Sequence, residues 1–481
     1  MPESAIVAAV HRSAARVPER PALIAGEIAV PYAELERRAA GAAAHIAEKA
    51  RGDIVGLFLP NGPAFVWTLL GALRAGKTVA VLPTLAPPPL LALMAAEAGL
   101  QTVLTAGELA PRLADAKVAP LPVEQFPAGA PERAPANRPL EAAVLLYTSG
   151  TTGRPKAVAL SDANILTNAD GCRVAAGFGN DEVMLAILPL FHAYGLTVTL
   201  FLPLMTGGTV VFLDRFAPRA VLQTIEQRRV SVMVAVPSQY RLLTREPTQA
   251  DTRSLWLCIS GAERLSEIVA QDFEARFHQP ILQGYGATEA APVVSMNSPT
   301  AHRPHTVGRP LPDVTVTLRE DGRALPAGEI GEVCVEGPNV MLGYHNQPQA
   351  TAEKIVNGVL RTGDRGFFDP DGFLHIAGRT DDLLKVAGEK IYPSEVERAI
   401  EQVAGVEEAA VVGVPDEVHG AVLRAFVQAK PGVALTEAAL RAACREHLEA
   451  NKLPRSFTLV EQMPRTPGGK VDKRALASQG A

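Results

Sequence analysis

The chain has 481 residues, two to four times the length of a typical domain, which predicts one large core together with a smaller unit. Apolar residues make up 47% and charged residues 20%, values typical of a globular protein that exclude a largely disordered chain. The net charge of -5 argues against a dedicated binder of nucleic acid or of anionic membranes.

The N-terminus and the cysteines point to a cytoplasmic protein. Basic residues between His11 and Arg20 interrupt any apolar stretch of the kind an export signal needs. The cysteines have neither disulfide-framework nor zinc-ligand spacing, which is typical of reduced thiols. They are Cys172, Cys258, Cys334 and Cys444. The sequence does not decide whether the chain forms a homodimer.

From about Arg51 to Gly286, short β-rich runs alternate with helical patterns, the order typical of an α/β fold with parallel sheets covered by helices. Several runs are almost continuously apolar, which predicts burial on both faces. The predicted strands are 54–59, 143–147, 183–188, 230–236, 255–260 and 281–286. The uncharged segment 188–213 is long enough to cross a bilayer, but its prolines and glycines instead predict a buried helix and a core strand at 209–213.

The pattern of apolar and turn residues changes after residue 303. Short alternating strands with turn residues predict an antiparallel β-subdomain over about 303–378. The remainder, 379–481, predicts a compact α+β lobe with helices at 393–401 and 436–448 and strands near 409–414 and 423–429. The Pro- and Ala-rich segment 119–139 predicts a surface connection.

A phosphate-binding loop is the strongest local signal. Glycines and small hydroxylated residues allow backbone N–H groups to surround an anion, and a lysine adds positive charge. The spacing differs from the Walker motif, so we expect another class of polyphosphate loop. It follows the apolar run 143–146 and comprises Tyr147, Thr148, Ser149, Gly150, Thr151, Thr152, Gly153, Arg154, Pro155 and Lys156.

This loop resembles the signature of the adenylate-forming superfamily, which includes acyl-CoA synthetases, peptide-synthetase adenylation domains and luciferases. Further blocks follow in the family's order, at 283–289, 361–364, 385–390 and 464–473. The resemblance implies a large N-terminal part, 1–378, with two parallel-rich, helix-covered sheets and a small antiparallel β-subdomain. It also implies a mobile C-terminal lobe, 379–481, that turns near Asp381.

The resemblance implies that ATP and Mg2+ are bound by residues from several blocks. The phosphate loop and Gly284, Tyr285 and Gly286 would hold ATP, with Tyr285 packed on the adenine. Thr288 would contact phosphate and Glu289 would bind Mg2+, since a hard cation takes carboxylate oxygens and keeps several waters. Asp364 would accept from the ribose hydroxyls, with Arg379 as its companion.

Three more residues receive roles through the same resemblance. Lys470, on a glycine-flanked loop, would neutralise charge between the acid and the α-phosphate. Gly388, in the loop from Lys385 to Lys390, would admit a pantetheine thiol. His192 would line or gate the acyl pocket.

These residues predict an AMP-forming acid–thiol ligase. It would convert a carboxylic acid, fatty or otherwise lipophilic, to an acyl-adenylate with release of pyrophosphate, and then form a thioester with coenzyme A. The sequence does not decide between these acids and aryl acids as substrates. A free amino acid is disfavoured, because no aspartate lies near 189–196 to bind its ammonium group. The main alternative acceptor is the phosphopantetheine of an acyl carrier protein. A luciferase-like oxidase and a non-catalytic scaffold are further alternatives, the latter disfavoured because Lys470, Glu289 and Asp364 are all present.

Overall fold

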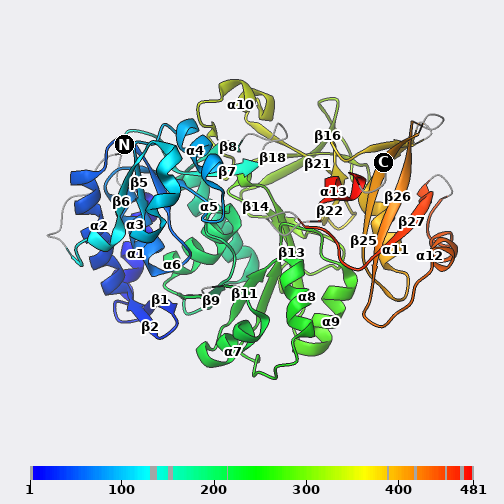
Figure 1. Cartoon of the computed structure of the whole chain (residues 1–481), viewed down its shortest axis with the longest axis horizontal. Coiled ribbons are helices and arrows are strands. Elements are labelled where there is room, and N and C mark those ends of the chain that lie inside the picture. The colour runs from blue at the N-terminus through cyan, green and yellow to red at the C-terminus, as the bar shows by residue number, and fades with distance from the viewer. Residues whose placement is uncertain are drawn as a thin grey trace.

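The computed structural model describes residues 4–129, 138–149, 155–213, 215–386, 389–416, 420–449, 452–465 and 471–478. Two large sheets and an antiparallel sheet form the main body, and two small sheets form the C-terminal lobe (Figure 1). The predicted α/β class, with two parallel-rich sheets and an antiparallel subdomain, is confirmed.

The first large sheet has seven strands in the order β19-β8-β7-β4-β3-β5-β6. The five strands from β7 to β6 pair in parallel, whereas β8 and β19 are antiparallel additions. The strands are β3 (Ile54–Phe58), β4 (Thr78–Val81), β5 (Thr102–Thr105), β6 (Ala119–Pro122), β7 (Ala142–Ser149), β8 (Pro155–Ser161) and β19 (Gly343–Tyr344).

The second large sheet has nine strands in the order β15-β14-β13-β12-β11-β9-β10-β1-β2. Its central strands are parallel, and β2, β14 and β15 pair antiparallel at its ends. The strands are β1 (Pro21–Ala25), β2 (Ile28–Pro31), β9 (Val183–Ala186), β10 (Thr209–Phe212), β11 (Val232–Ala235), β12 (Leu257–Ser260), β13 (Ile281–Gly286), β14 (Val293–Met296) and β15 (Arg309–Pro310).

The remaining strands form an antiparallel sheet and the lobe. The antiparallel sheet contains β16 (Thr315–Glu320), β17 (Arg323–Ala324), β18 (Gly331–Glu336), β20 (Ile355–Val356), β21 (Val359–Phe368) and β22 (Leu374–Arg379). The lobe contains β23 (Leu384–Val386), β24 (Glu389–Ile391), β25 (Val406–Asp416), β26 (Gly420–Ala429) and β27 (Ser456–Val460).

Helices separate and cover the two large sheets. The layer between the sheets holds α1 (Ala5–Arg16), α2 (Tyr32–Lys49), α3 (Pro63–Arg74), α5 (Asp162–Ala176), the π-helix η3 (Gly195–Phe201) and α6 (Leu202–Thr206). The outer face of the seven-stranded sheet packs on α4 (Pro88–Glu97) and the 3-10 helix η1 (Gly107–Ala116). The outer face of the nine-stranded sheet packs on α7 (Pro218–Arg228), α8 (Pro237–Arg245) and α9 (Glu267–Phe277).

Short helices complete the chain. They are the 3-10 helices η2 (Val123–Gln125) and η4 (Thr288–Ala290), then α10 (Pro348–Lys354) in the main body, and α11 (Pro393–Glu401), α12 (Glu437–Cys444) and α13 (Lys473–Ser478) in the lobe. The lobe has its own core under α11 and α12, and it lies at the right of Figure 1.

Burial on both faces explains the apolar strands. In β11, Val232 and Val234 face one core while Met233 and Ala235 face the other. Every position is therefore apolar, and the period-2 alternation of a half-exposed strand disappears.

Two predicted segments need correction. The supposed surface connection contains β6, because Ala119–Pro122 adds a parallel edge strand to β5. The predicted β-subdomain is not self-contained, because β15 and β19 leave it to pair with the two large sheets.

The predicted helix and strand over 188–213 are confirmed by η3, α6 and β10. Among the described residues there is no helix that could span a membrane.

Ion pairs join the lobe to the main body. Arg241 of α8 lies 2.8 Å from Glu408, and Arg245 lies 2.7 Å from Glu407, both at the start of β25. Arg264, which precedes α9, lies 2.6 Å from Glu401 at the end of α11. The three glutamates are buried by this contact.

Asp162 ties the N-terminus to the main body. Its carboxylate pairs with Arg138 and accepts bonds from the Ser4 hydroxyl and, at 3.0 Å, from the Ile6 N–H. Both charged side chains are about nine-tenths buried. Removal of one partner would therefore leave an unpaired charge in the interior.

We expect Asp162→Ala to lower the free energy of unfolding by about 3 kcal/mol, because breaking a buried pair strands the other charge. Chemical denaturation measures this loss. The control is Asp251→Ala, which removes an ion pair to the largely exposed Arg253 and should change the free energy of unfolding little. Equal losses in the two variants would contradict the assignment.

Candidate functional site

The site begins where β13 ends. This strand is parallel to β12 as far as Gln283 and then pairs antiparallel with β14. Its last residues, Gly284–Gly286, therefore lie at the carboxyl edge of the parallel strands, where α/β sheets bind ligands. A Cβ on Gly286 would come 2.1 Å from the Pro292 carbonyl oxygen, so only glycine fits.

A tyrosine, a carboxylate and a guanidinium group meet beside this edge. The Tyr285 hydroxyl donates to Asp364 Oδ2 at 2.6 Å. Asp364 of β21 is opposite Arg379 of β22, with Arg379 Nε 3.9 Å from Asp364 Oδ1. Burial and then the Asp364 charge raise the pKa of Tyr285 well above its usual value, so the hydroxyl remains a donor. The residues predicted to contact adenine and ribose therefore lie together, although Arg379 ends a strand of the main body rather than opening the lobe.

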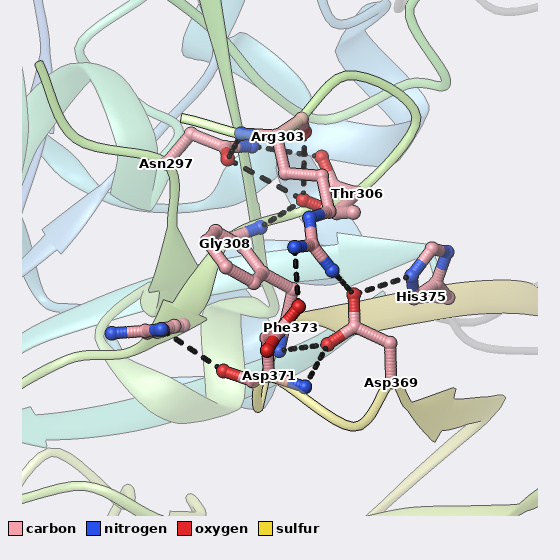
Figure 2. A network of polar contacts seen from close by, with 9 residues as sticks. Asn297, Arg303, Thr306, Gly308, Asp369, Asp371, Phe373 and His375 are labelled. Atoms are coloured by element: carbon pink, nitrogen blue, oxygen red, sulfur yellow. Dashed lines mark hydrogen bonds and ion pairs between the residues drawn. The ribbon is translucent and has the colours of Figure 1, made fainter. Parts of the chain in front are cut away.

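A clamp of polar contacts fixes the turn between β21 and β22, the strands that carry Asp364 and Arg379. Figure 2 shows Arg303 between two carboxylates, with nitrogen–oxygen distances of 2.5 Å to both Asp369 and Asp371. The Arg303 guanidinium also stacks on Phe373, 4.7 Å from the ring centre. Asn297 Oδ1 accepts from the Arg303 N–H at 2.9 Å, so the clamp reaches back to the end of β14.

Gly308 allows the clamp to close. Leu374 N–H donates to the Gly308 carbonyl at 2.8 Å, and Gly308 has φ +78°. A Cβ there would lie 1.8 Å from the Met296 carbonyl carbon. Only glycine can therefore lie this close to the end of β14 while its carbonyl accepts from the β21–β22 hairpin.

Thr288 and Glu289 lie in η4, directly after β13. Two buried amides fix the end of η4: Asn168 of α5 donates to the Val293 carbonyl at 2.6 Å, and Asn339 donates to the Ala290 carbonyl at 3.0 Å. The Glu289 carbonyl accepts from Met341 N–H at 2.9 Å. Thr288 and Glu289 are thus held by long-range contacts.

Tyr344 of β19 connects Glu289 with the phosphate-loop lysine. Its hydroxyl donates to Glu289 Oε1 at 2.8 Å, and Lys156 Nζ lies 5.0 Å from the centre of its ring. Burial, and then the charge of Glu289, raise the pKa of the Tyr344 phenol, so it stays protonated and donates. No local pattern in the sequence marks Tyr344 as a site residue.

The phosphate loop joins two antiparallel strands. Thr148 and Ser149 end β7, Pro155 and Lys156 begin β8, and Thr148 is opposite Lys156 in the register. The loop therefore connects the antiparallel pair β7 and β8, which lies between β4 and the edge strand β19 of the seven-stranded sheet. Gly150, Thr151, Thr152 and Gly153 lie outside the described residues.

His192 lies in the loop between β9 and η3. Its backbone N–H donates to the Pro189 carbonyl at 3.1 Å, and its exposed ring lies 4.6 Å from that of Phe191. Asn61 anchors this loop through the Leu188 carbonyl, at 2.8 Å, and the Leu190 N–H, at 3.0 Å. The acyl-pocket role of His192 stays a prediction.

Lys470 and Gly388 also lie outside the described residues. The segment that carries Lys470 is bounded by a β-bridge between Arg465 and Val471. Arg465 lies 2.7 Å from Glu408, which pairs with Arg241 of the main body. Asp381, the predicted hinge, is exposed in the turn after β22.

Comparison with known proteins identifies the family. Residues 10–345 match the family described as AMP-binding enzyme, and residues 395–470 match its C-terminal domain. The chain belongs to this family of adenylate-forming enzymes. It is an AMP-forming acid–thiol ligase, for which ATP, Mg2+ and coenzyme A are the cofactors.

Members of this family with assigned acids resemble the chain closely. It is 35% identical over 476 residues to a feruloyl-CoA synthase of Amycolatopsis, covering 96% of each chain. It is 34% identical over 445 residues to a sulfoacetate–CoA ligase of Cupriavidus necator, covering 88% of this chain and 87% of the relative. A long-chain-fatty-acid–CoA ligase of Bacillus subtilis is 36% identical over 347 residues, which cover 70% of this chain and 61% of the relative.

The fold agrees with a solved structure of the family. ATP-bound MatB from Rhodopseudomonas palustris superimposes with a TM-score of 0.90 at 28% identity, covering 98% of each chain.

The donor set around Glu289 fits Mg2+. This cation takes oxygen ligands, retains several waters and needs only one or two carboxylates beside substrate phosphates. Among the residues that the structure describes, no group of three or more His, Cys, Asp or Glu could hold a metal ion alone. A single carboxylate such as Glu289 would suit a cation that arrives with the nucleotide, whose phosphate charge the cation would neutralise.

The clamp predicts a pH dependence of stability. Burial alone would raise the pKa of Asp369, but bonds from the Phe373 N–H, Arg303 and His375 outweigh it and lower the pKa to about 2. Since an unfolded aspartate has a pKa of about 3.9, the Asp369 carboxylate stabilises the fold above pH ~4, and this contribution is lost as the pH falls through 2.

We expect Asp369→Asn to weaken the dependence of the free energy of unfolding on pH at acid pH. Denaturation between pH 5 and pH 2.5 should show the free energy of unfolding falling less steeply in the variant than in the wild type. Asp371→Asn is the matched control, because Asp371 is mostly exposed. If the free energy of unfolding of the wild type and of Asp369→Asn fell equally with pH, the bonds to Asp369 would not be the source of the acid sensitivity.

Proposed function

We propose that the chain joins a carboxylic acid bearing a polar group to coenzyme A through an acyl-adenylate. One arrangement carries this proposal. The short segment from Tyr285 to Glu289 holds Asp364 at one end and, through Tyr344, Lys156 at the other. A ribose-binding carboxylate, a cation-binding carboxylate and a phosphate-binding lysine are thereby gathered around one strand end.

In the first step, a carboxylate oxygen of the acid attacks the α-phosphorus of ATP, and the bond to pyrophosphate breaks. Asp364 accepts from the ribose hydroxyls, while the β7–β8 hairpin and Lys156 hold the phosphates. Lys470 offsets the negative charge that accumulates as the reacting groups approach. Positioning and electrostatics supply most of the rate in transfers of this kind.

In the second step, the sulfur of a thiolate attacks the acyl carbonyl carbon, and AMP leaves with the oxygen of the broken bond. We propose that the lobe turns at Asp381 between the steps and brings Gly388 beside the thiol path. The ion pairs from Arg241, Arg245 and Arg264 to the lobe belong to the orientation described above.

Tyr194 supports a polar acid rather than the plain fatty acid expected from the sequence. Its hydroxyl is buried and, among the described residues, has no hydrogen-bond partner. Its ring lies against Gly261 at the end of β12, where an added Cβ would be 2.9 Å from the ring. A buried unpaired hydroxyl costs about 1–3 kcal/mol, which an acceptor on the substrate would offset. The relatives named for ferulate and sulfoacetate agree with this choice, whereas the fatty-acid relative does not.

The first test is pyrophosphate release with a panel of aryl, sulfonated, dicarboxylic, fatty and amino acids, with mass spectrometry of the products with and without coenzyme A. We expect release with an acid that carries a polar group away from its carboxyl, and acylation of coenzyme A. An adenylate that accumulates while coenzyme A stays free would favour a carrier-protein acceptor. Equal rates with fatty acids would contradict the polar class.

Tyr194→Phe should reduce the preference for the polar acid over its hydrocarbon analogue by about tenfold or more, because the variant loses the donor but keeps the ring. The melting temperature should not fall, since the hydroxyl has no bond to lose. Tyr240→Phe is the control, because its buried hydroxyl donates within the core, 2.9 Å from the Ile259 carbonyl oxygen. That variant should lose stability and keep its selectivity. Unchanged selectivity in Tyr194→Phe would contradict the role of Tyr194.

A further inference from the structure

Tyr344 stands between two oppositely charged side chains of the site. One face of its ring lies 5.0 Å from Lys156 Nζ, and its hydroxyl donates to Glu289 Oε1 at 2.8 Å. Tyr344 is itself buried, with 6% of its surface exposed. The three residues belong to β8, η4 and β19, which are far apart in the sequence.

The backbone fixes the position of this ring. β19 pairs with β8, with Tyr344 opposite Val158, two residues beyond Lys156. The Tyr344 N–H donates to Thr351 Oγ1 at 2.9 Å, and Met341 N–H donates to the Glu289 carbonyl at 2.9 Å. Tyr344 is therefore held on both sides by contacts that do not involve its own ring.

Without the ring, the Lys156 ammonium and the Glu289 carboxylate would attract each other, because opposite charges in a partly buried site are only weakly screened. A direct Lys156–Glu289 pair would withdraw the ammonium from the phosphates and the carboxylate from the cation. The aromatic face instead attracts the ammonium without neutralising it. The hydroxyl engages Oε1, so that Oε2 can turn to a cation.

We propose that Tyr344 is a positioning residue that keeps Lys156 and Glu289 apart, reserving the lysine for polyphosphate and the glutamate for Mg2+. This inference rests on the proposed nucleotide chemistry. It assigns the two halves of one side chain different tasks: the ring places Lys156, and the hydroxyl orients Glu289.

Two variants separate the tasks. Tyr344→Phe keeps the ring and removes the hydroxyl, whereas Tyr344→Leu removes both the hydroxyl and the aromatic face. Binding is measured with a non-hydrolysable ATP analogue. Mn2+ serves as a spectroscopic substitute for Mg2+, titrated by electron paramagnetic resonance, and calorimetry gives the affinity for the nucleotide alone.

Tyr344→Phe should weaken Mn2+ binding in the nucleotide complex by about tenfold, the usual cost of losing a residue that orients a metal ligand, with little change in metal-free nucleotide affinity. Tyr344→Leu should weaken both the binding of Mn2+ and the binding of the nucleotide alone, because it removes the hydroxyl and the aromatic face. Tyr32→Phe is the control, because its buried hydroxyl donates far from the site, 2.7 Å from the Gly208 carbonyl oxygen, and both affinities should match the wild type.

Mn2+ affinity in Tyr344→Phe equal to that of the wild type would overturn the inference, as would identical profiles for the two variants. The binding measurements do not depend on the acid. If no acid in the panel releases pyrophosphate and the two variants still differ as expected, the proposed reaction fails and the role of Tyr344 stands.

Discussion

The hydrogen bond from Tyr285 to Asp364 joins the nine-stranded sheet to the antiparallel sheet, and the site depends on this junction. Glu289 lies in the turn that directly follows Tyr285, and Arg379 is the register partner of Asp364 on the neighbouring strand. Arg303 and Gly308 brace the same junction from behind, where the chain leaves β14. The groups proposed to meet the nucleotide are therefore positioned by contacts within the fold, and donors and charges that need no reorganisation stabilise a transition state best.

Much of this fold could be predicted because its signals are local. Strands buried on both faces are almost continuously apolar, so β3, β11 and β12 could be predicted from their apolar runs. The phosphate loop could be predicted because backbone that approaches an anion closely excludes a Cβ, whereas the block at the end of β13 was assigned through the family resemblance. Edge strands were missed, because two-residue elements such as β15 and β19 carry no period of their own and exist only through their partners.

The same distinction separates the site residues that the sequence revealed from those it did not. Thr148, Glu289 and Asp364 lie in motifs whose neighbours in the sequence mark them. Asn168, Asn339 and Tyr344 act across long separations, and each occurs in a segment that local pattern would assign to an ordinary helix, loop or strand. What distinguishes them is that each buries a polar side chain and donates a hydrogen bond to a segment far away in the sequence. That property exists only in three dimensions.

Ion pairs form part of the contact between the lobe and the main body, and this bears on how the two parts can move. Arg241, Arg245 and Arg264 pair there with buried glutamates of the lobe. An apolar interface would cost about 25 cal/mol for each Å² exposed on separation. Charged side chains recover hydration when they part, so a buried ion pair contributes little net stability while still demanding a defined geometry. An interface of this kind specifies one orientation of the lobe without holding it there strongly, as the proposed turn at Asp381 would require.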